Sequence, residues 1–290
     1  MEVVMFNNQI NYRLNLLNVI IVCLIIFSTF KISVSASSLI VNGPVAEGEI
    51  NPAGEADWWT FSAQEGHYYS IIHNGSFDVY LRAYRADGTT IIDTLISGGR
   101  NKRSTLTTPA SEDVHLSIKA ESNSQTGTYK LLCREFFHDP QPITVNGPPV
   151  QGEINPPGDE NWWTMQVEAG KSYAMAYNGY DAYADLYHAD GEYFRYLNYK
   201  YGSGRSTFQA EKTETIYIGV HSEYVHNTFT YTLLCREFFH DPQPITVNGP
   251  PVQGEINPPG DENWWTMQVE AGKSYAMAYN GYDAYADLYH

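Results

Sequence analysis

The sequence is poor in cysteine, and this shortage excludes a disulfide-stabilised scaffold. It has only 3 cysteines in 290 residues, and Cys23 lies in an N-terminal apolar stretch. The other two, Cys133 and Cys235, occupy the same position in two repeats, so no disulfide framework can be inferred. We expect both to be buried free thiols at the ends of strand-like runs, with a bridge between repeats as the alternative.

Positive charge is also scarce. The chain has 17 Lys and Arg against 33 Asp and Glu, which gives a formal net charge of −16. A phosphate backbone or an anionic membrane would be repelled, so nucleic-acid binding is disfavoured. We predict no cofactor. A calcium site is the alternative, with Glu153, Asp159 and Glu160 as oxygen ligands; solvated turn residues are the competing interpretation.

Catalytic motifs are missing as well. The sequence contains neither a G-x-S-x-G nor an H-E-x-x-H motif, so we predict no catalytic residue and no enzyme activity within these residues. His221 and His226 are interpreted as surface residues, because repeat 1 has no histidine there. The recurring pair His138 and Asp139 is interpreted as linker capping. We therefore predict no metal site.

An apolar stretch over residues 16–30 follows Arg13 and precedes Val34, Ser35 and Ala36. This pattern predicts a signal peptide over residues 1–36, cleaved after Ala36. The protein would then be secreted, with no stable membrane insertion after cleavage. A signal anchor is the alternative, but about fifteen apolar residues are fewer than the roughly twenty that span a bilayer.

Internal repetition organises the rest of the chain. Residues 131–188 and 233–290 are identical, and Asn42 to Thr60 align with Asn146 to Thr164. We predict repeat 1 over 38–142, repeat 2 over 143–244 and a partial repeat 3 over 245–290. The third copy lacks the counterpart of 189–234, so we expect it to be truncated and unable to close its core. We interpret residues 136–142 as a short, semi-rigid linker whose two prolines block regular pairing.

Short runs of alternating polarity, separated by Gly, Pro, Asn and Asp, predict a β-sandwich or barrel. In repeat 2, alternation places Trp163, Met165 and Val167 in the core and Trp162 on the outer face. The expected strands of repeat 2 cover residues 151–154, 162–167, 172–177, 182–187, 193–199, 206–209, 215–221 and 229–235, with turns at 155–158, 169–171, 178–179 and 190–191.

The order of motifs resembles the bacterial pre-peptidase C-terminal domain. Repeat 2 has G-D-E-N-W-W at 158–163, V-E-A-G-K-S-Y at 167–173, D-A-Y-A-D-L-Y at 181–187, D-G at 190–191 and Y-T-L at 231–233; repeat 1 matches from 57 to 131. The resemblance covers nearly all of the mature chain. It implies an all-β fold of tandem jelly-roll-like antiparallel β-sandwiches on secreted proteins, often beside peptidase domains, with relatives that bind collagen or polysaccharide. Asn161, Met165 and Phe229 depart from the pattern, so no ligand site is carried over.

Outward-facing aromatic side chains are the candidate ligand-binding residues, because flat, stiff rings suit stacking on sugars or docking of a peptide strand. The alternative is that the neighbouring copy or the linker covers this face, since Phe136 and Phe137 also need burial. The candidates are Trp58, Tyr80 and Tyr84 in repeat 1 and Trp162, Tyr183, Tyr187 and Tyr196 in repeat 2.

These observations predict a secreted, non-catalytic binding or spacer protein. Its repeats would present aromatic surfaces multivalently to an extracellular polysaccharide or a matrix-type protein. One alternative is a set of accessory domains of a secreted peptidase whose catalytic domain lies outside this chain. The other is a purely structural surface stalk.

Overall fold

The computed structural model describes residues 36–222, 225–281 and 285–290, without the side chains of 180–182, 196 and 198–203. Every regular element in this described part is a β-strand, which confirms the all-β prediction. The predicted signal peptide lies outside the described residues, apart from Ala36. Within the described ranges, no helix has the length and apolar character needed to cross a bilayer.

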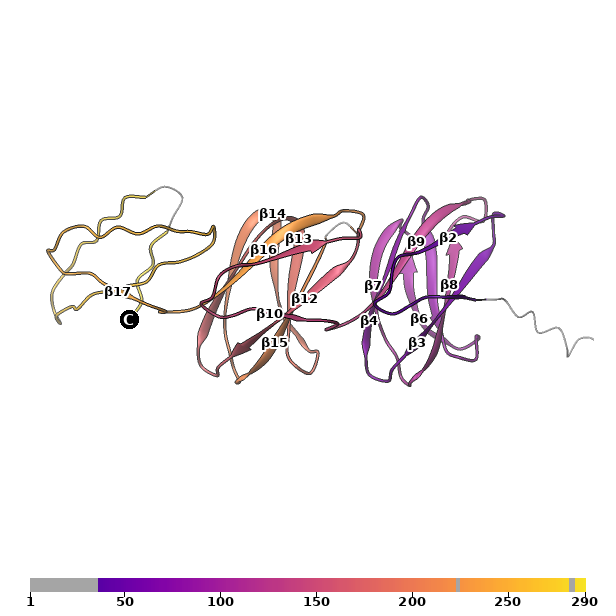
Figure 1. Cartoon of the computed structure of the whole chain (residues 1–290), viewed down its shortest axis with the longest axis horizontal. Helices are drawn as coiled ribbons and strands as arrows, with labels where there is room; N and C mark the ends of the chain where they lie inside the picture. Colours follow the sequence, from indigo (N-terminus) through magenta and orange to yellow (C-terminus); the bar gives the residue numbers. More distant parts are fainter. Residues whose placement is uncertain (1–35, 223–224, 282–284) are drawn as a thin grey trace, which may run out of the picture.

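Repeat 1 is a two-layer β-sandwich (Figure 1). One sheet has the strand order β1-β3-β8-β5-β6 and the other β2-β9-β4-β7. The short β1 pairs with β3 in parallel, and the remaining neighbours pair antiparallel. The strands are β1 Ser37–Ser38, β2 Ala46–Ile50, β3 Ala56–Ala63, β4 Tyr68–Gly75, β5 Val79–Tyr84, β6 Ile91–Ser97, β7 Asn101–Thr107, β8 Glu112–Ala120 and β9 Gly127–Glu135.

The core of repeat 1 lies between its two sheets. Alternation along β3 buries Trp59, Phe61 and Ala63, the counterparts of the predicted core residues Trp163, Met165 and Val167. The Trp59 indole donates a hydrogen bond of 2.8 Å to the Tyr129 hydroxyl, which in turn donates one of 2.6 Å to Asp57. Each fully buried large apolar side chain contributes roughly 1.5–3 kcal/mol to folding. The two layers are therefore held by packing and by a satisfied polar link between them.

In repeat 2, two long strands take the place of two pairs of strands of repeat 1, and all seven strands belong to one sheet. They are β10 Gln141–Pro142, β11 Val150–Ile154, β12 Glu160–Val167, β13 Ser172–Tyr187, β14 Tyr193–Gln209, β15 Glu214–Ser222 and β16 Phe229–Glu237.

The predicted turn at residues 178–179 is wrong. Strand β13 runs straight through it, pairing first with β16 and then with β15. A two-residue hairpin turn requires positive φ, which neither Asn178 nor Gly179 has. Gly179 serves a close approach instead, because a Cβ there would lie 2.1 Å from the Tyr177 hydroxyl. In repeat 1 the same stretch is divided into β4 and β5.

The linker between repeats 1 and 2 is part of the second sandwich. We expected its prolines to block regular pairing, and this is wrong for Gln141 and Pro142, which pair with Trp163 and Thr164 of β12. The following amide of Ile143 donates to the Thr164 carbonyl at 2.7 Å. Proline is tolerated here because β10 is an edge strand. The linker is therefore paired with the sheet of repeat 2 and is not a flexible tether between the repeats.

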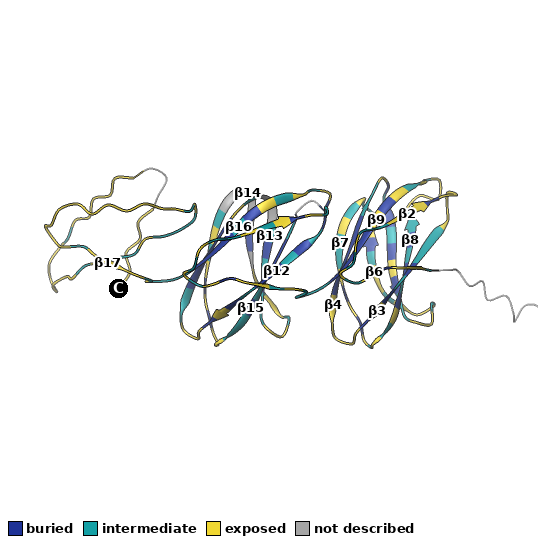
Figure 2. Ribbon diagram, viewed as in Figure 1, coloured by how far each residue is buried: buried dark blue, intermediate teal, exposed yellow. Residues whose placement is uncertain are grey.

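The described residues of 245–290 contain only one strand, β18 Trp265–Thr266, which pairs in parallel with β17 Gln243–Pro244. Large apolar side chains of this segment are exposed, among them Val269 and Met277, and all of its described residues are exposed or partly exposed, as Figure 2 shows. This agrees with the expectation that the third copy does not close a core.

Cys133 and Cys235 lie inside the cores of their sandwiches as free thiols. Burial raises the pKa of the Cys133 thiol and raises that of Cys235 to about 12. Because the thiolate is the reactive form, both thiols are unreactive in the folded chain. The expectation of buried free thiols is confirmed.

Candidate functional site

The two sandwiches meet end to end (Figure 1), and the contact between them is the candidate functional site. We call it the first junction. It joins Arg103 and Arg134 of repeat 1 to Asp159 and Glu160 of repeat 2, and it includes the aromatic and apolar groups described below. It lies between the end of β9, the last strand of repeat 1, and the start of β12 in repeat 2.

Arg134 forms the first ion pair of the junction. Its Nε and Nη2 donate to the two carboxylate oxygens of Asp159 at 2.6 and 3.0 Å, and its Nη1 donates to the Gly43 carbonyl at 2.6 Å. The Arg134 side chain is 8% exposed and that of Asp159 is 15% exposed. Such a planar, two-bond pair fixes direction as well as distance. The turn before β12 is thereby fixed to the last strand of repeat 1.

Arg103 and Glu160 form the second ion pair. Arg103 also donates through Nη2 to the carbonyls of Gly158 and Asp159, at 2.8 and 3.2 Å. The Glu160 carboxylate accepts from the Ser70 hydroxyl at 2.9 Å and from the Trp162 indole at 3.1 Å. The Glu160 side chain is only 3% exposed. A buried charge requires this many partners, because an unpaired one would be strongly unfavourable.

An aromatic cluster covers one side of these ion pairs. Phe136 and Phe137 leave β9 and pack on Trp162 with ring centroids 5.1 and 4.8 Å away. Phe137 also lies 4.1 Å from the Tyr217 ring, and Phe136 lies 5.7 Å from that of Tyr187. Tilted and edge-to-face pairs at such distances add about 0.5–1.5 kcal/mol each beyond burial of area.

A small apolar patch completes the junction. Ile72 and Leu132 of repeat 1 pack with Val225 of repeat 2, and all three are buried. Gly158 lies against this patch with φ of +83°, and a Cβ there would lie 2.7 Å from the Val225 carbonyl oxygen and 2.8 Å from Ile72 Cγ2. Only glycine therefore allows the two repeats to approach this closely.

Gly158→Ala is expected to destabilise the junction by about 1–3 kcal/mol through overpacking, in addition to the cost of positive φ. Gly170→Ala is the matched control, because Gly170 has a φ of +81° but a Cβ added there would meet nothing within 4 Å. Guanidinium unfolding of both variants measures the difference. Equal losses would mean that the contact with Ile72 carries no energy.

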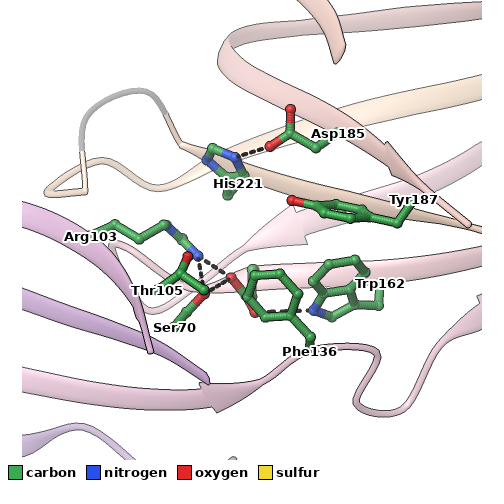
Figure 3. Close-up of a pocket in the computed structure, with 10 residues that line it drawn as sticks. Ser70, Arg103, Thr105, Phe136, Trp162, Asp185, Tyr187 and His221 are labelled. Atoms are coloured by element: carbon green, nitrogen blue, oxygen red, sulfur yellow. Dashed lines mark hydrogen bonds and ion pairs between the residues drawn. The ribbon is translucent and has the colours of Figure 1, made fainter. Parts of the chain in front are cut away.

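A cavity of about 90 Å³ lies inside the first junction. Glu160 and Arg103 line it, and Figure 3 shows a second polar pair across from Arg103, His221 and Asp185, whose Nε2 and Oδ2 atoms are 3.0 Å apart. Burial, followed by the nearby carboxylates, raises the pKa of Tyr187, which also lines the cavity. The cavity has room for a few small polar molecules and not for a sugar chain.

The same contacts recur after repeat 2, and we call them the second junction. Arg236 donates to both carboxylate oxygens of Asp261 at 2.7 and 2.8 Å and to the Gly147 carbonyl at 2.5 Å. Arg205 pairs with Glu262. The hydrogen bond to Asp261 raises the pKa of Arg236. Burial opposes ionisation of Asp261, but the hydrogen bonds from Arg236 and a backbone amide outweigh it, so the pKa of Asp261 is lowered.

The aromatic cluster also recurs at the second junction. Phe238 and Phe239 pack on Trp264 with centroids 5.3 and 4.7 Å away. Trp264 lies 5.5 Å from Tyr289 at 58°, and Trp162 lies 5.5 Å from Tyr187 at 55°. The two junctions therefore share one geometry, although the second is formed with a segment that has little strand structure.

Trp162 lies on the outer face of its sheet, as predicted, but protein and not solvent covers that face. Its side chain is 4% exposed because Phe136 and Phe137 cover it, and Tyr187 lies in the same cluster. For Trp162 and Tyr187 the structure agrees with the alternative interpretation, in which the linker covers this face. Tyr183 is half-buried beside His221, 5.7 Å away, at the cavity side of the sheet. The side chain of Tyr196 lies outside the described residues.

Trp58, the counterpart of Trp162 in repeat 1, is less deeply buried. Trp58 and Tyr84 are half-buried and lie 5.2 Å apart at 47°. Tyr80 lies at the other end of the same strand β5 and is also half-buried. The structure thus brings Trp58 and Tyr84 together and leaves Tyr80 apart from that pair.

The residues that suggested metal sites have other partners. The carboxylates of Asp159 and Glu160 bind arginines, and His221 pairs with Asp185. His138 forms a hydrogen bond of 2.7 Å with the Glu135 carbonyl. In the described part of the chain, no group of three or more potential metal-binding side chains comes together.

Sequence reasoning missed the two arginines of each junction. The available signal was the recurrence of Arg-Glu-Phe-Phe at 134–137 and 236–239, in which a charged residue precedes two apolar ones at the end of a strand. A charge kept beside residues that need burial suggests a partner carboxylate. The partner itself, 25 residues further on, could not be read from spacing.

Neither a protein-family model nor a curated protein matches this chain. Similar solved structures include the pre-peptidase C-terminal domain of a collagenase from Bacillus anthracis, with 18% identity, 33% of this chain and 94% of that chain covered, and a TM-score of 0.30. A secreted serine protease from Vibrio cholerae has 15% identity, with 68% of this chain and 48% of that chain covered and a TM-score of 0.27. The tandem CBM22 domains of a Paenibacillus barcinonensis protein have 9% identity, with 66% of this chain and 91% of that chain covered and a TM-score of 0.22.

Proposed function

We propose that this chain is a secreted, non-catalytic spacer whose β-sandwich repeats are held end to end in a fixed orientation. The observation that carries the proposal is the recurrence of one junction at two places. Each junction has an arginine bound through two hydrogen bonds to an aspartate, a second arginine paired with a glutamate, and two phenylalanines on a tryptophan.

A flexible tether would not need such contacts. Domains joined by a mobile linker usually share a small and mostly polar interface. Here the linker residues Phe136 and Phe137 are packed, and Gln141 and Pro142 are paired in a sheet. The charged pairs fix rotation about the long axis, whereas the aromatic cluster supplies apolar burial. Both properties serve a rod that keeps its ends at a set distance.

Spin labels at two exposed positions test the proposal in the full chain. Thr89→Cys lies on repeat 1 and Glu211→Cys on repeat 2, and both native residues are exposed. Cys133 and Cys235 are buried and will not be labelled. Double electron–electron resonance is expected to give one narrow distance distribution. A broad distribution, as from independently moving domains, would refute the spacer.

Binding of an extracellular polysaccharide or a matrix-type protein is a second candidate function. It is favoured by Trp58 and Tyr84, two neighbouring rings that are each half-buried. Such a pair of rings could stack on a sugar. Accessory domains of a secreted peptidase would use the same fixed spacing, since a junction of this kind would hold a neighbouring catalytic domain at a constant distance.

A further inference from the structure

A groove of about 820 Å³ lies on the outer face of repeat 1, next to the first junction. Strands β2, β9 and β4, which are neighbours in one sheet, form its floor, and Pro156 and Pro157 of repeat 2 complete its lining. Its volume is within the roughly 300–1,000 Å³ of ordinary ligand sites, which favour the contacts between domains. The lining residues of repeat 1 are 45, 47–49, 72, 74–76 and 128–132. Because both repeats supply part of the groove, it is complete only while they are docked.

The end of the groove nearest the junction is apolar. Ile72 of β4 is paired with Leu132 of β9, and Val45, just before β2, packs against the buried patch that they form. The half-buried rings of Pro156 and Pro157 extend this apolar surface from repeat 2. An apolar side chain of a ligand would be removed from water here, which favours binding.

The other end of the groove is acidic. Glu47 and Glu49 point outward from β2, because alternation turns Gly48 between them toward the core. Glu47 pairs with Lys130 of β9 at 3.3 Å, but both side chains are exposed, and an exposed pair of this kind contributes little to stability. Glu49 accepts a hydrogen bond of 3.4 Å from the neutral Asn51. Two carboxylates against one ammonium group leave this end negative.

We propose that the groove binds an extended peptide segment of a partner protein, with basic side chains at alternate positions and an apolar side chain toward the junction. Residues two apart in an extended chain face the same way about 6.6 Å apart, which is the spacing of Glu47 and Glu49 along β2. Basic side chains also suit a chain of net charge −16.

A peptide is chosen over a sugar because the groove offers no ring for stacking. Tyr129, the aromatic side chain among its lining residues, is 2% exposed and belongs to the core. Such a peptide site goes beyond the spacer function, and it rests on that function only for the docking of the two repeats.

The second junction lacks most of the acidic end. In repeat 2, Gln151 and Thr232 take the places of Glu47 and Lys130, whereas Glu153 keeps the place of Glu49. A peptide at the second junction would meet one carboxylate in place of two. We therefore expect one peptide to bind per chain, at the first junction.

Fluorescence anisotropy of the full chain with a labelled ten-residue peptide of alternating lysine and valine, in 0.15 M salt, tests the proposal. Saturable binding of one peptide per chain is expected. Glu47→Gln/Glu49→Gln should weaken it about fivefold, the size expected for two exposed ion pairs. Glu65→Gln/Glu121→Gln is the matched control, since it removes the same charge from exposed positions outside the groove and should leave the affinity unchanged. Equal weakening by both double variants would mean general attraction to an acidic chain and would overturn the proposal.

Two variants on the other side of the junction test whether repeat 2 belongs to the site. Pro157→Ala trims the apolar lining and should weaken peptide binding about threefold. Arg134→Ala lies outside the groove but should weaken binding at least as much, because the lining from repeat 2 is no longer held in place. An unchanged affinity in both variants would overturn the proposal and leave the spacer standing. A broad wild-type spin-label distance that narrows when the peptide is added would refute the spacer and support the groove.

Discussion

Arg134→Ala is expected to release repeat 2 from repeat 1 and to turn a fixed rod into two loosely tethered sandwiches. The variant leaves the carboxylate of Asp159, only 15% exposed, without its main partner. Breaking one side of a buried ion pair costs about 3–5 kcal/mol. The spin-label distance between positions 89 and 211 should broaden, and Phe136 and Phe137 should become accessible to a hydrophobic dye.

Two further variants separate the ion pair from general damage. Arg236→Ala removes the equivalent arginine of the second junction and should leave the first distance unchanged. Arg134→Ala/Asp159→Ala removes both charges and should be less disruptive than the single variant, because no buried charge is stranded. If the distance stays narrow in Arg134→Ala, the Arg103–Glu160 pair, the aromatic cluster and the apolar patch hold the repeats together without it.

Acidification is expected to destabilise repeat 1 through His73. This side chain is fully buried, with Nδ1 2.7 Å from the Arg100 carbonyl and no hydrogen-bond partner for Nε2 among the described residues. Burial lowers the pKa of His73 from 6.5 to about 4, and the bond to Arg100 offsets only part of this. Between these values the unfolded chain binds a proton that the folded chain does not. Stability is therefore complete above pH 6.5 and falls by about 3 kcal/mol as the pH drops to 4.

Repeat 2 provides the control for this prediction. Tyr177 takes the place of His73, and Gly179 makes room beside it as Gly75 does for His73. His73→Tyr should therefore fit and should remove the extra loss of stability in acid. Hydrogen exchange of strand β4 in guanidinium, at pH 7 and pH 4, measures the free energy of opening of repeat 1. An equal acid loss in the wild type and in His73→Tyr would assign the effect to other groups.

Much of the fold could be predicted from the sequence because alternation of polarity reports burial directly. The residues Trp163, Met165 and Val167 were assigned to the core and are 7%, 2% and 2% exposed. Alternation failed at Asn178 and Gly179, since the same residue types serve a tight turn or a strand that crosses between sheets. Besides the local Tyr177 hydroxyl, a Cβ at Gly179 would lie 2.7 Å from Cβ of Tyr231 on β16, a tertiary contact that local patterns do not report.

The site was predicted only in part, for a related reason. Alternation places Trp162 on the outer face of its sheet, and this is true of the sheet taken alone. Whether solvent or protein lies on that face depends on the next domain, which local patterns do not encode. The need of Phe136 and Phe137 for burial hinted at the answer. The partnership of Arg103 with Glu160 spans 57 residues and two domains, and nothing in its local sequence marks it.

The identical stretches 131–188 and 233–290 do not coincide with a sandwich. Each begins before Arg134 or Arg236 and ends after Tyr187 or Tyr289, so it contains most of a joint and only parts of two modules. Unequal crossing-over between such stretches in the gene would add or delete one whole module and leave every joint intact. Alleles of different length would then encode rods that differ in reach and keep the same stiffness.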